Sequence, residues 1–279
     1  MIPPIANRFV AGESVPAAVA HTKSMNTNGV HVILNLLGEH YDITGEAKED
    51  VDTYLELITQ ITAENLDASV SVKPSQIGLD ISDELFVENY QKIVAHAYEH
   101  DAFVWCDMED ATTTDITIQA FCETAKAHPW TVGQCFQSNL KRTADDLADV
   151  IDVPGKIRIV KGAYNESSTI AYTDKSAVND AYRRDIEYLF SNRSHGVAIG
   201  SHDPEMIALA QSLASEHETE YGIQMLMGVR ESAQLELAQD GVTISQYAPY
   251  GDKWFSYFYR RVRERKENAL FALRAIVRS

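Results

Sequence analysis

The chain has little cysteine and no long hydrophobic run, and both absences exclude classes of protein. Of its 279 residues only three are cysteines, and Cys106, Cys122 and Cys135 show no CxxC spacing. Three cysteines cannot all pair with one another, so the sequence argues against a disulfide framework or a structural zinc site and favours a reducing compartment. No apolar run is long enough to span a bilayer, and no charged-then-apolar leader follows Met1. We therefore expect a cytoplasmic protein.

Basic residues are also scarce. Lysine and arginine number 24 against 41 aspartates and glutamates, which gives a formal net charge of -17. This charge disfavours nucleic acid and an anionic membrane surface as electrostatic partners. An anionic ligand would have to be held by a local cluster of cations that opposes the overall field.

Several signature motifs of enzymes are missing as well. The chain contains no GxGxxG fingerprint, no Walker loop, no GxSxG elbow and no HxH or HExxH pair. The first two absences disfavour a doubly wound nucleotide-binding fold. The others argue against a serine hydrolase and make metal-dependent hydrolysis a weaker reading.

What the sequence does contain is a regular alternation of two patterns. Short β-rich apolar runs recur at intervals of roughly 20–40 residues, and a stretch with helical periodicity follows each one. The expected strands are 30–37, 69–73, 103–107, 131–137, 157–161, 197–201, 223–227 and 242–247. The expected helices are 48–64, 83–100, 115–127, 143–150, 175–189, 204–217, 231–239 and 252–276, after one or two lead-in helices in the first 29 residues.

Eight such units predict a (β/α)8 TIM barrel, an α/β fold in which helices cover a closed parallel sheet. The strands read as apolar on both faces, which favours a parallel sheet. No linker or low-complexity tract divides the chain. We expect a single domain over residues 1–279, with the final helix carrying Arg260 and Arg261 over the barrel mouth.

Polar residues gather at the predicted carboxyl ends of these strands, where barrel enzymes build their sites. The positions are Glu39, Lys73, Asp107, Glu109, Gln137, Lys161, Tyr164, Ser201, His202, Gln224 and Tyr247, with Arg158 inside the fifth strand. Each alone also fits a surface, capping or structural role, and the conjunction is what indicates a site. Buried charge must be paired or ligand-bound, and Lys73, Asp107 and Arg158 can neutralise one another while they line a cavity.

Two adjacent arginines on the last predicted helix, Arg260 and Arg261, add guanidinium forks that suit a small carboxylate. They also fit a solvated basic helix face, because further basic residues follow. With cations for an anionic substrate and no evident nucleophile–base pair, the set suggests that a cofactor carries the chemistry. A metal-dependent lyase or hydrolase that uses Asp107, Glu109 and His202 stays open.

Five short motifs occur at these strand ends and on the last helix. They are Leu36–Glu39 (LLGE), Val72–Gly78 (VKPSQIG), Asp107–Glu109 (DME), Arg158–Tyr164 (RIVKGAY) and Tyr247–Glu264 (YxPxG followed by RRxxE). In this order, and with RFVAGE near the start of the chain, they resemble the proline dehydrogenases. The resemblance is to the bacterial single-function type and to the corresponding domain of bifunctional proline utilisation enzymes, and it covers nearly the whole chain.

The resemblance implies a distorted (β/α)8 barrel that holds FAD at the carboxyl end of its strands. It implies oxidation of L-proline to Δ1-pyrroline-5-carboxylate by hydride transfer from C5 to flavin N5, the first step of proline catabolism to glutamate. A quinone, often in the membrane, would reoxidise the flavin, so transient peripheral contact at the inner face of the membrane is a further expectation.

The resemblance also assigns roles to residues. The implied substrate-binding residues are Lys73, Tyr247, Leu226, Arg260, Arg261 and Glu39. Among these, the arginine pair grips the carboxylate, and Glu39 closes the site by pairing with Arg260. The implied catalytic residues are Asp107, which organises the charges, and Arg158, which lies near flavin N5. The implied FAD contacts are Met108, Gln137, Arg158, Val160, Lys161, Gly162, Ala163, Lys175, Ser201, His202 and Glu264.

Three positions depart from the family pattern on the cofactor side. Asp203 stands where asparagine is usual, Asn139 where tyrosine is common, and Gly222 where an acid is often found. These departures do not touch the residues assigned to proline. Two related readings also stay open: an enzyme for hydroxyproline or another cyclic amino acid, against which Tyr247 argues by resemblance, and a catalytically silent proline sensor.

Overall fold

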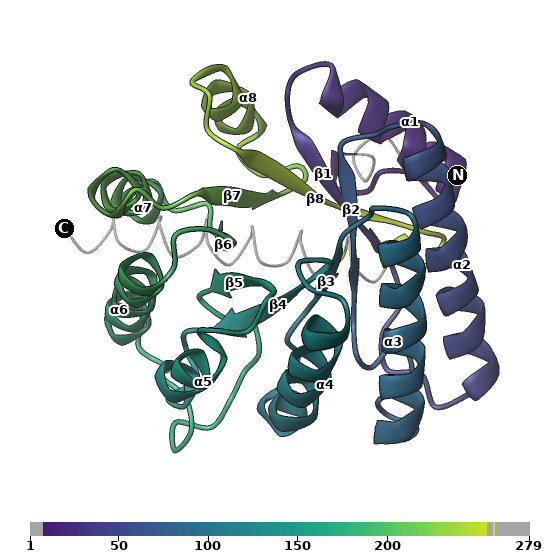
Figure 1. Cartoon of the computed structure of the whole chain (residues 1–279), viewed down its shortest axis with the longest axis horizontal. Helices are drawn as coiled ribbons and strands as arrows, with labels where there is room; N and C mark the ends of the chain where they lie inside the picture. The colour runs from purple at the N-terminus through teal and green to yellow at the C-terminus, as the bar shows by residue number, and fades with distance from the viewer. Residues whose placement is uncertain (1–7, 256–258, 260–279) are drawn as a thin grey trace.

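Eight parallel strands form a closed barrel in chain order (Figure 1). The computed structural model describes residues 8–255 and Tyr259. The strands are β1 (His31–Leu36), β2 (Ala68–Val72), β3 (Val104–Cys106), β4 (Val132–Gln137), β5 (Lys156–Val160), β6 (Val197–Gly200), β7 (Tyr221–Leu226) and β8 (Ile244–Tyr250). Because β1 pairs with both β2 and β8, the ring is closed. The predicted (β/α)8 barrel is confirmed.

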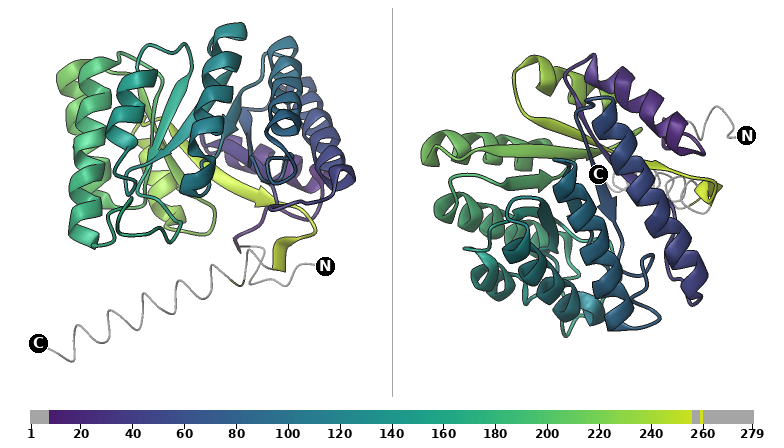
Figure 2. Two further views of the ribbon diagram at one scale, coloured as in Figure 1. Left: turned by 90° about the horizontal axis from the view of Figure 1, so that it is seen from below. Right: turned by 45° about the vertical axis from the view of Figure 1, so that its right-hand side comes forward.

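Helices surround the barrel on its outside (Figure 2). They are α1 (Val15–Asn26), α2 (Thr44–Ala63), α3 (Asp83–Glu99), α4 (Thr114–Ala127), α5 (Thr143–Val150), α6 (Lys175–Asn192), α7 (Pro204–His217) and α8 (Glu231–Gln239), with a short 3-10 helix, η2 (Ala111–Thr113), before α4. α1 is a lead-in helix that lies between α8 and α2 (Figure 1). The predicted last helix, with Arg260 and Arg261, lies almost entirely outside the described residues.

Side chains at the helix starts explain where several helices begin. Ser82 precedes α3, and its side chain accepts a hydrogen bond from the Leu85 backbone N–H at 3.2 Å. Before α7, the Asp203 side chain accepts a hydrogen bond from the Glu205 backbone N–H at 3.1 Å, and Pro204 occupies the first turn of that helix. Such a cap contributes about 1 kcal/mol to helix stability. Between residues 8 and 255, no helix has the length and apolar character that a bilayer crossing requires.

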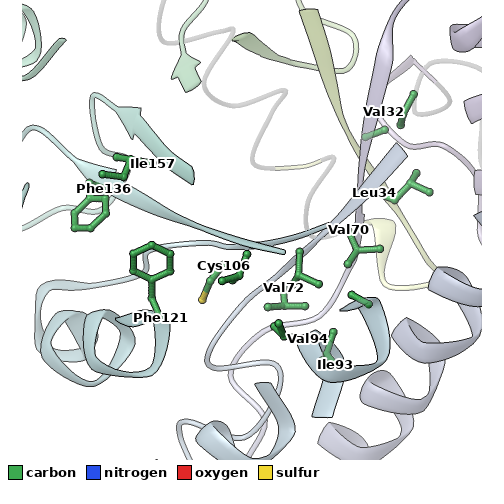
Figure 3. Packing of buried hydrophobic residues seen from close by; sticks show 14 of the residues in the cluster. Val32, Leu34, Val70, Val72, Ile93, Val94, Cys106, Phe121, Phe136 and Ile157 are labelled. Carbon is green, nitrogen blue, oxygen red and sulfur yellow. The ribbon is translucent and has the colours of Figure 1, made fainter. Parts of the chain in front are cut away.

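The main apolar core lies between the strands and the helices. Figure 3 shows part of this core, where strand side chains lie near Ile93 and Val94 of α3 and Phe121 of α4. The strand residues labelled there are Val32, Leu34, Val70, Val72, Cys106, Phe136 and Ile157. All of them are buried. Burial of one large apolar side chain stabilises a fold by about 1.5–3 kcal/mol, so this layer holds the barrel and its helices together.

The inner face of the strands differs from the expected one. Ile33, Trp105 and Ala198 form a small cluster although β1, β3 and β6 are not neighbours, so these side chains meet inside the barrel. Ser71 is the register partner of Trp105, and Arg158 is that of Ala198, which places both on the inner face. The prediction of strands apolar on both faces was wrong for this face, because polar site residues occupy part of it.

Candidate active site

One buried carboxylate organises the carboxyl end of the barrel. Lys73 Nζ donates to Asp107 Oδ2 at 2.9 Å, and the Tyr247 hydroxyl donates to the same oxygen at 2.7 Å. Ser71 Oγ donates to Asp107 Oδ1 at 2.9 Å, and Arg158 Nη2 also donates to this oxygen. We call these five residues the Asp107 cluster. The structure thus brings together side chains that the sequence separates by up to 176 positions (247 − 71).

Arg158 lies inside the barrel between two aromatic rings and is only 4% exposed. Its guanidinium carbon is 4.9 Å from the centre of the Trp105 ring and 5.8 Å from that of the Tyr247 ring. Its Nη1 donates to Gln224 Oε1 at 3.2 Å. A guanidinium that is stacked on rings and bonded at both nitrogens is held in one orientation, so Arg158 presents a fixed positive charge.

The charges of the Asp107 cluster set one another's protonation states. Burial alone would raise the pKa of Asp107, but Lys73 and Arg158 stabilise its charged form by more, and its pKa falls well below the usual range. Burial would lower the pKa of Lys73, yet the Asp107 carboxylate, together with Tyr247, Glu109 and Tyr164, more than reverses this, and the Lys73 pKa rises well above its ordinary value. Two cations face one carboxylate, which leaves one positive charge (+1 +1 −1) among these three groups. This surplus suits a single anionic ligand group.

Glu109 is a second buried carboxylate, and it connects the loops. Its Oε2 accepts from the Ser75 N–H at 2.7 Å, and its Oε1 accepts from Ser75 Oγ at 2.7 Å. The Glu109 carbonyl accepts from Gln137 Nε2 at 2.7 Å, and Gln137 Oε1 accepts from the Ala163 N–H at 3.4 Å. These bonds link the segments that follow β2, β3 and β5 to the last residue of β4. Gln137 and Ala163, both predicted cofactor contacts, therefore lie side by side.

Lys161 is paired within the protein. Its Nζ donates to Asp203 Oδ2 and to Asn179 Oδ1, each at 2.7 Å. Burial would raise the pKa of Asp203, but the hydrogen bonds from Lys161 and the Glu205 N–H, with the positive charges of Lys161 and Lys175, together outweigh it and the pKa is lowered. Asp203 therefore neutralises Lys161 and caps α7, and it is not an isolated negative charge beside the expected cofactor position.

Gly162 approaches Asn139 too closely to carry a side chain. Its φ is +107°, and a Cβ at this position would overlap the Asn139 amide group. The Asn139 N–H donates to the Lys161 carbonyl at 2.9 Å, which fixes the two segments against each other. Glycine at 162 is therefore required by this packing. Gly162 and Ala163 are both exposed, and we call this pair the Gly162–Ala163 cradle.

Leu226 and Tyr247 are register partners on β7 and β8, and both are half-buried. We call this pair the ring wall. Tyr247 was expected at the carboxyl end of its strand, but β8 continues to Tyr250, so Tyr247 lies in mid-strand and reaches Asp107 from there. The ring wall thus joins an apolar side chain, Leu226, to a phenol that also belongs to the Asp107 cluster.

The other predicted site residues differ in how far they are exposed to solvent. Met108 and Ser201 are buried, Glu39, Val160 and His202 are half-buried, and Lys175 is exposed at the start of α6. Arg260, Arg261 and Glu264 lie outside the described residues.

Comparison with known proteins identifies the family. The sequence model described as proline dehydrogenase matches residues 18–274. Proline dehydrogenase 1 of Bacillus subtilis (strain 168) is 34% identical over 276 residues, which is 98% of this chain and 91% of that protein. The chain belongs to the proline dehydrogenase family. The proline dehydrogenase of Deinococcus radiodurans is likewise 34% identical, over 284 residues, and the match covers 98% of this chain and 90% of the relative.

Solved structures of proline utilization A share the barrel. The Bdellovibrio bacteriovorus protein, inactivated by N-propargylglycine, matches with a TM-score of 0.85 and 22% identity, over 92% of this chain and 32% of that one. A mutant of the Bradyrhizobium japonicum protein matches with a TM-score of 0.78 and 21% identity, over 92% and 30%. This proline dehydrogenase family member spans about a third of those chains, and the similarity shows a common fold.

The metal-dependent alternative finds no support in this member of the proline dehydrogenase family. Asp107 faces two cations, Glu109 binds a serine, and His202 accepts a hydrogen bond from a backbone N–H. Within the described part of the chain, no three His, Cys, Asp or Glu side chains gather where they could hold an ion.

Two residues of the candidate site, Ser71 and Trp105, which contact Asp107 and Arg158, were not predicted from the sequence. Each lies in a strand that reads as apolar, two positions before a predicted site residue: Ser71 before Lys73, and Trp105 before Asp107. Side chains two apart in a strand share a face. This alternation is the signal that could have revealed both.

Proposed function

We propose that this chain oxidises L-proline to Δ1-pyrroline-5-carboxylate with FAD as the hydride acceptor. The observation that carries the proposal is the Asp107 cluster, which sets one surplus positive charge beside the ring wall. L-Proline has the matching chemistry, since it carries a carboxylate on a small apolar ring. The match to named proline dehydrogenases along 98% of the chain supports the same conclusion.

Side chains of the cluster would bind and orient this substrate. Lys73 Nζ has three donors, and Asp107 takes one of them, so the others can reach a carboxylate. By resemblance, Arg260 and Arg261 would add two guanidinium forks at the same end. With the ring wall against its other side, a rigid five-membered ring has one way to lie, and its C5 is positioned for reaction.

The cluster would position charge and would not remove a proton. Asp107 has a lowered pKa, and Lys73 has a raised one. Burial and the Asp107 charge both raise the pKa of Tyr247, which stays a phenol and a donor. None of the three groups gains or loses a proton near neutral pH. Such a site suits hydride removal from a ring whose amine is already neutral.

Residues at the end of β4 and in the segments that follow β5 and β6 fit FAD. The Gly162–Ala163 cradle offers close backbone approach, Gln137 lies beside it, and Ser201 contributes a hydroxyl. FAD, when bound, supplies the two-electron acceptor that protein side chains lack. Arg158 would hold its fixed charge where the resemblance places the flavin ring. The further expected contacts are Met108, Val160, Lys161, Lys175, His202 and Glu264.

A quinone would accept the electrons from the reduced flavin. Each turnover delivers two electrons that must leave before the next, and the family resemblance indicates a quinone for this step. The encounter would take place during transient peripheral contact with the inner face of the membrane.

An anaerobic visible spectrum of the purified protein, recorded before and after addition of L-proline, tests the proposal. We expect a yellow flavin spectrum that bleaches with L-proline. Flavin that L-proline does not bleach would refute the substrate and direct the test to hydroxyproline and other cyclic amino acids. Protein that holds no flavin, even after reconstitution with FAD, would refute the cofactor.

Replacement of Gly162 by alanine should weaken FAD binding and lower stability. The left-handed φ and the overlap with Asn139 both oppose a Cβ here, and together they should cost about 1 kcal/mol or more. Relief of the overlap would displace the backbone that FAD is proposed to approach, so titration of the apoprotein with FAD, followed by fluorescence, should show a dissociation constant about tenfold higher, which corresponds to about 1.4 kcal/mol of binding free energy.

Gly45→Ala is the matched control for Gly162→Ala. Gly45 lies in the first turn of α2, where the nearest atom to an added Cβ is 3.9 Å away. Alanine is the better helix former, so this variant should keep its FAD affinity and its thermal midpoint. If both glycine variants bind FAD like the parent protein, the cradle is not part of the cofactor site.

A further inference from the structure

The backbone of Leu226 is held from two sides at the turn between β7 and α8. Its N–H donates to His202 Nε2 at 3.2 Å. Its carbonyl accepts from Gln234 Nε2 at 3.0 Å, and the same amide nitrogen donates to the Val229 carbonyl at 2.9 Å. The turn contains two residues with left-handed backbone, Gly228 (φ +77°) and Arg230 (φ +49°). The Val229 backbone N–H also donates to the Leu226 carbonyl, at 3.3 Å, so the Gln234 side-chain amide supplements the backbone hydrogen bonding of this turn.

Gln234 belongs to a relay of hydrogen bonds whose direction is determined throughout. Gln234 is fully buried, and its amide nitrogen faces two carbonyls, so its Oε1 must accept. Gln246 Nε2 donates to that oxygen at 2.9 Å, and Gln246 Oε1 lies 2.7 Å from His21 Nε2. Because that oxygen can only accept, His21 Nε2 carries a hydrogen. The relay therefore runs from His21 on α1, through Gln246 on β8 and Gln234 on α8, to the carbonyl of Leu226 on β7.

We propose that Gln234 is a positioning residue for the ring wall, and that His21 and Gln246 extend its support to α1. The inference rests on the proposed oxidation of L-proline, because it assigns Leu226 to the face that contacts the substrate ring. Loss of the amide donor would leave the Val229 carbonyl and the Gln246 amide without these partners, and would leave the Leu226 carbonyl with the Val229 backbone N–H at 3.3 Å, so the turn would shift to find new partners. Leu226 would move with it, while the Asp107 cluster and the Gly162–Ala163 cradle keep their own hydrogen bonds.

The test compares Gln234→Met with Thr219→Val. Methionine matches the shape of glutamine and lacks its donors. Thr219 is also buried, and its hydroxyl bonds two backbone carbonyls, of Phe190 and Arg193, at 3.2 and 2.9 Å. It precedes β7 in the loop after α7, at the amino end of the strand and so at the opposite end from the site. Both variants lose a buried hydrogen-bond donor, but only Gln234→Met loses one that bonds the backbone of Leu226.

We expect Gln234→Met to raise KM for L-proline about tenfold, with kcat and the FAD dissociation constant within about twofold of the parent values. Thr219→Val should lower the thermal midpoint comparably and leave KM unchanged. An unchanged KM in Gln234→Met, together with a lowered midpoint, would overturn the positioning role and leave a structural one. Parent protein whose flavin L-proline does not bleach would refute the proposed function itself, so the two failures are distinct.

His21 provides a milder second test at the far end of the relay. His21→Gln retains an amide donor that can reach Gln246 Oε1, and it should preserve KM. His21→Leu removes the donor and should raise KM in the same direction as Gln234→Met, by a smaller factor. Equal KM values for the two His21 variants would show that the relay does not extend to α1.

Discussion

Replacing Asp107 with alanine is expected to lower kcat/KM for L-proline by about a hundredfold or more and to destabilise the fold. The carboxylate accepts hydrogen bonds from Lys73 and Arg158, and its removal leaves the buried Arg158 and the half-buried Lys73 without their anion. An uncompensated buried charge costs about 3–5 kcal/mol. Steady-state kinetics and thermal unfolding of the FAD-loaded protein would measure both effects.

Asp107→Asn separates the charge of this side chain from its shape. Folding lowers the pKa of Asp107, so the stability from its charge is fully present above its unfolded pKa of about 3.9 and is lost as pH falls through the lower folded value. The asparagine variant should lack this acid-dependent loss. Asp149 is an exposed acid on α5, and Asp149→Ala should leave kinetics and midpoint unchanged. If Asp107→Ala lost its flavin, the residue would be structural and not part of the substrate site.

Replacing Arg158 with methionine should slow reduction of the bound flavin by about a hundredfold or more, with a smaller change in the affinity for L-proline. Methionine keeps much of the volume between Trp105 and Tyr247 but removes the fixed charge. Rapid mixing of oxidised protein with L-proline under anaerobic conditions would give the rate of reduction and its dependence on substrate concentration.

Arg158→Lys tests whether charge alone accounts for the role of Arg158. Lysine restores the charge, but it cannot bond Asp107 and Gln224 at once or stack flat between two rings. It should therefore recover only part of the rate. Arg183→Lys, at a surface arginine that pairs with Glu205, should reduce flavin at the parent rate. A parent-like rate in Arg158→Met would exclude Arg158 from the reaction step.

The fold could be predicted because two periodicities alternate along the chain. The start of α7 was placed correctly because Asp203 and Pro204 are local signals for the start of a helix. The start of α2 was placed four residues late. This helix begins at Thr44 after Ile43, whose side chain makes no capping bond, so no local signal marks its start.

The site could be predicted only in part. Asp107, Lys73 and Arg158 were grouped correctly, since the carboxyl ends of all barrel strands meet at one face. The pairing of Lys161 with Asp203 spans 42 positions and depends on how two loops approach each other. The relay from His21 to Leu226 spans 205 positions (226 − 21) and depends on how four elements, α1, β8, α8 and β7, pack together. Neither leaves a pattern in the sequence.

The division of the strands into an apolar outer face and an inner face that polar site residues share with a small apolar cluster has a consequence for engineering. In β2, Val70 and Val72 face the helices, and Ser71 between them faces the barrel interior. A combinatorial library at uncharged inward positions, such as 71, 105 and 224, would vary the reactive chamber while the outer packing stays intact. The same library shifted by one residue would fall on the outer layer and would mostly yield chains that do not fold.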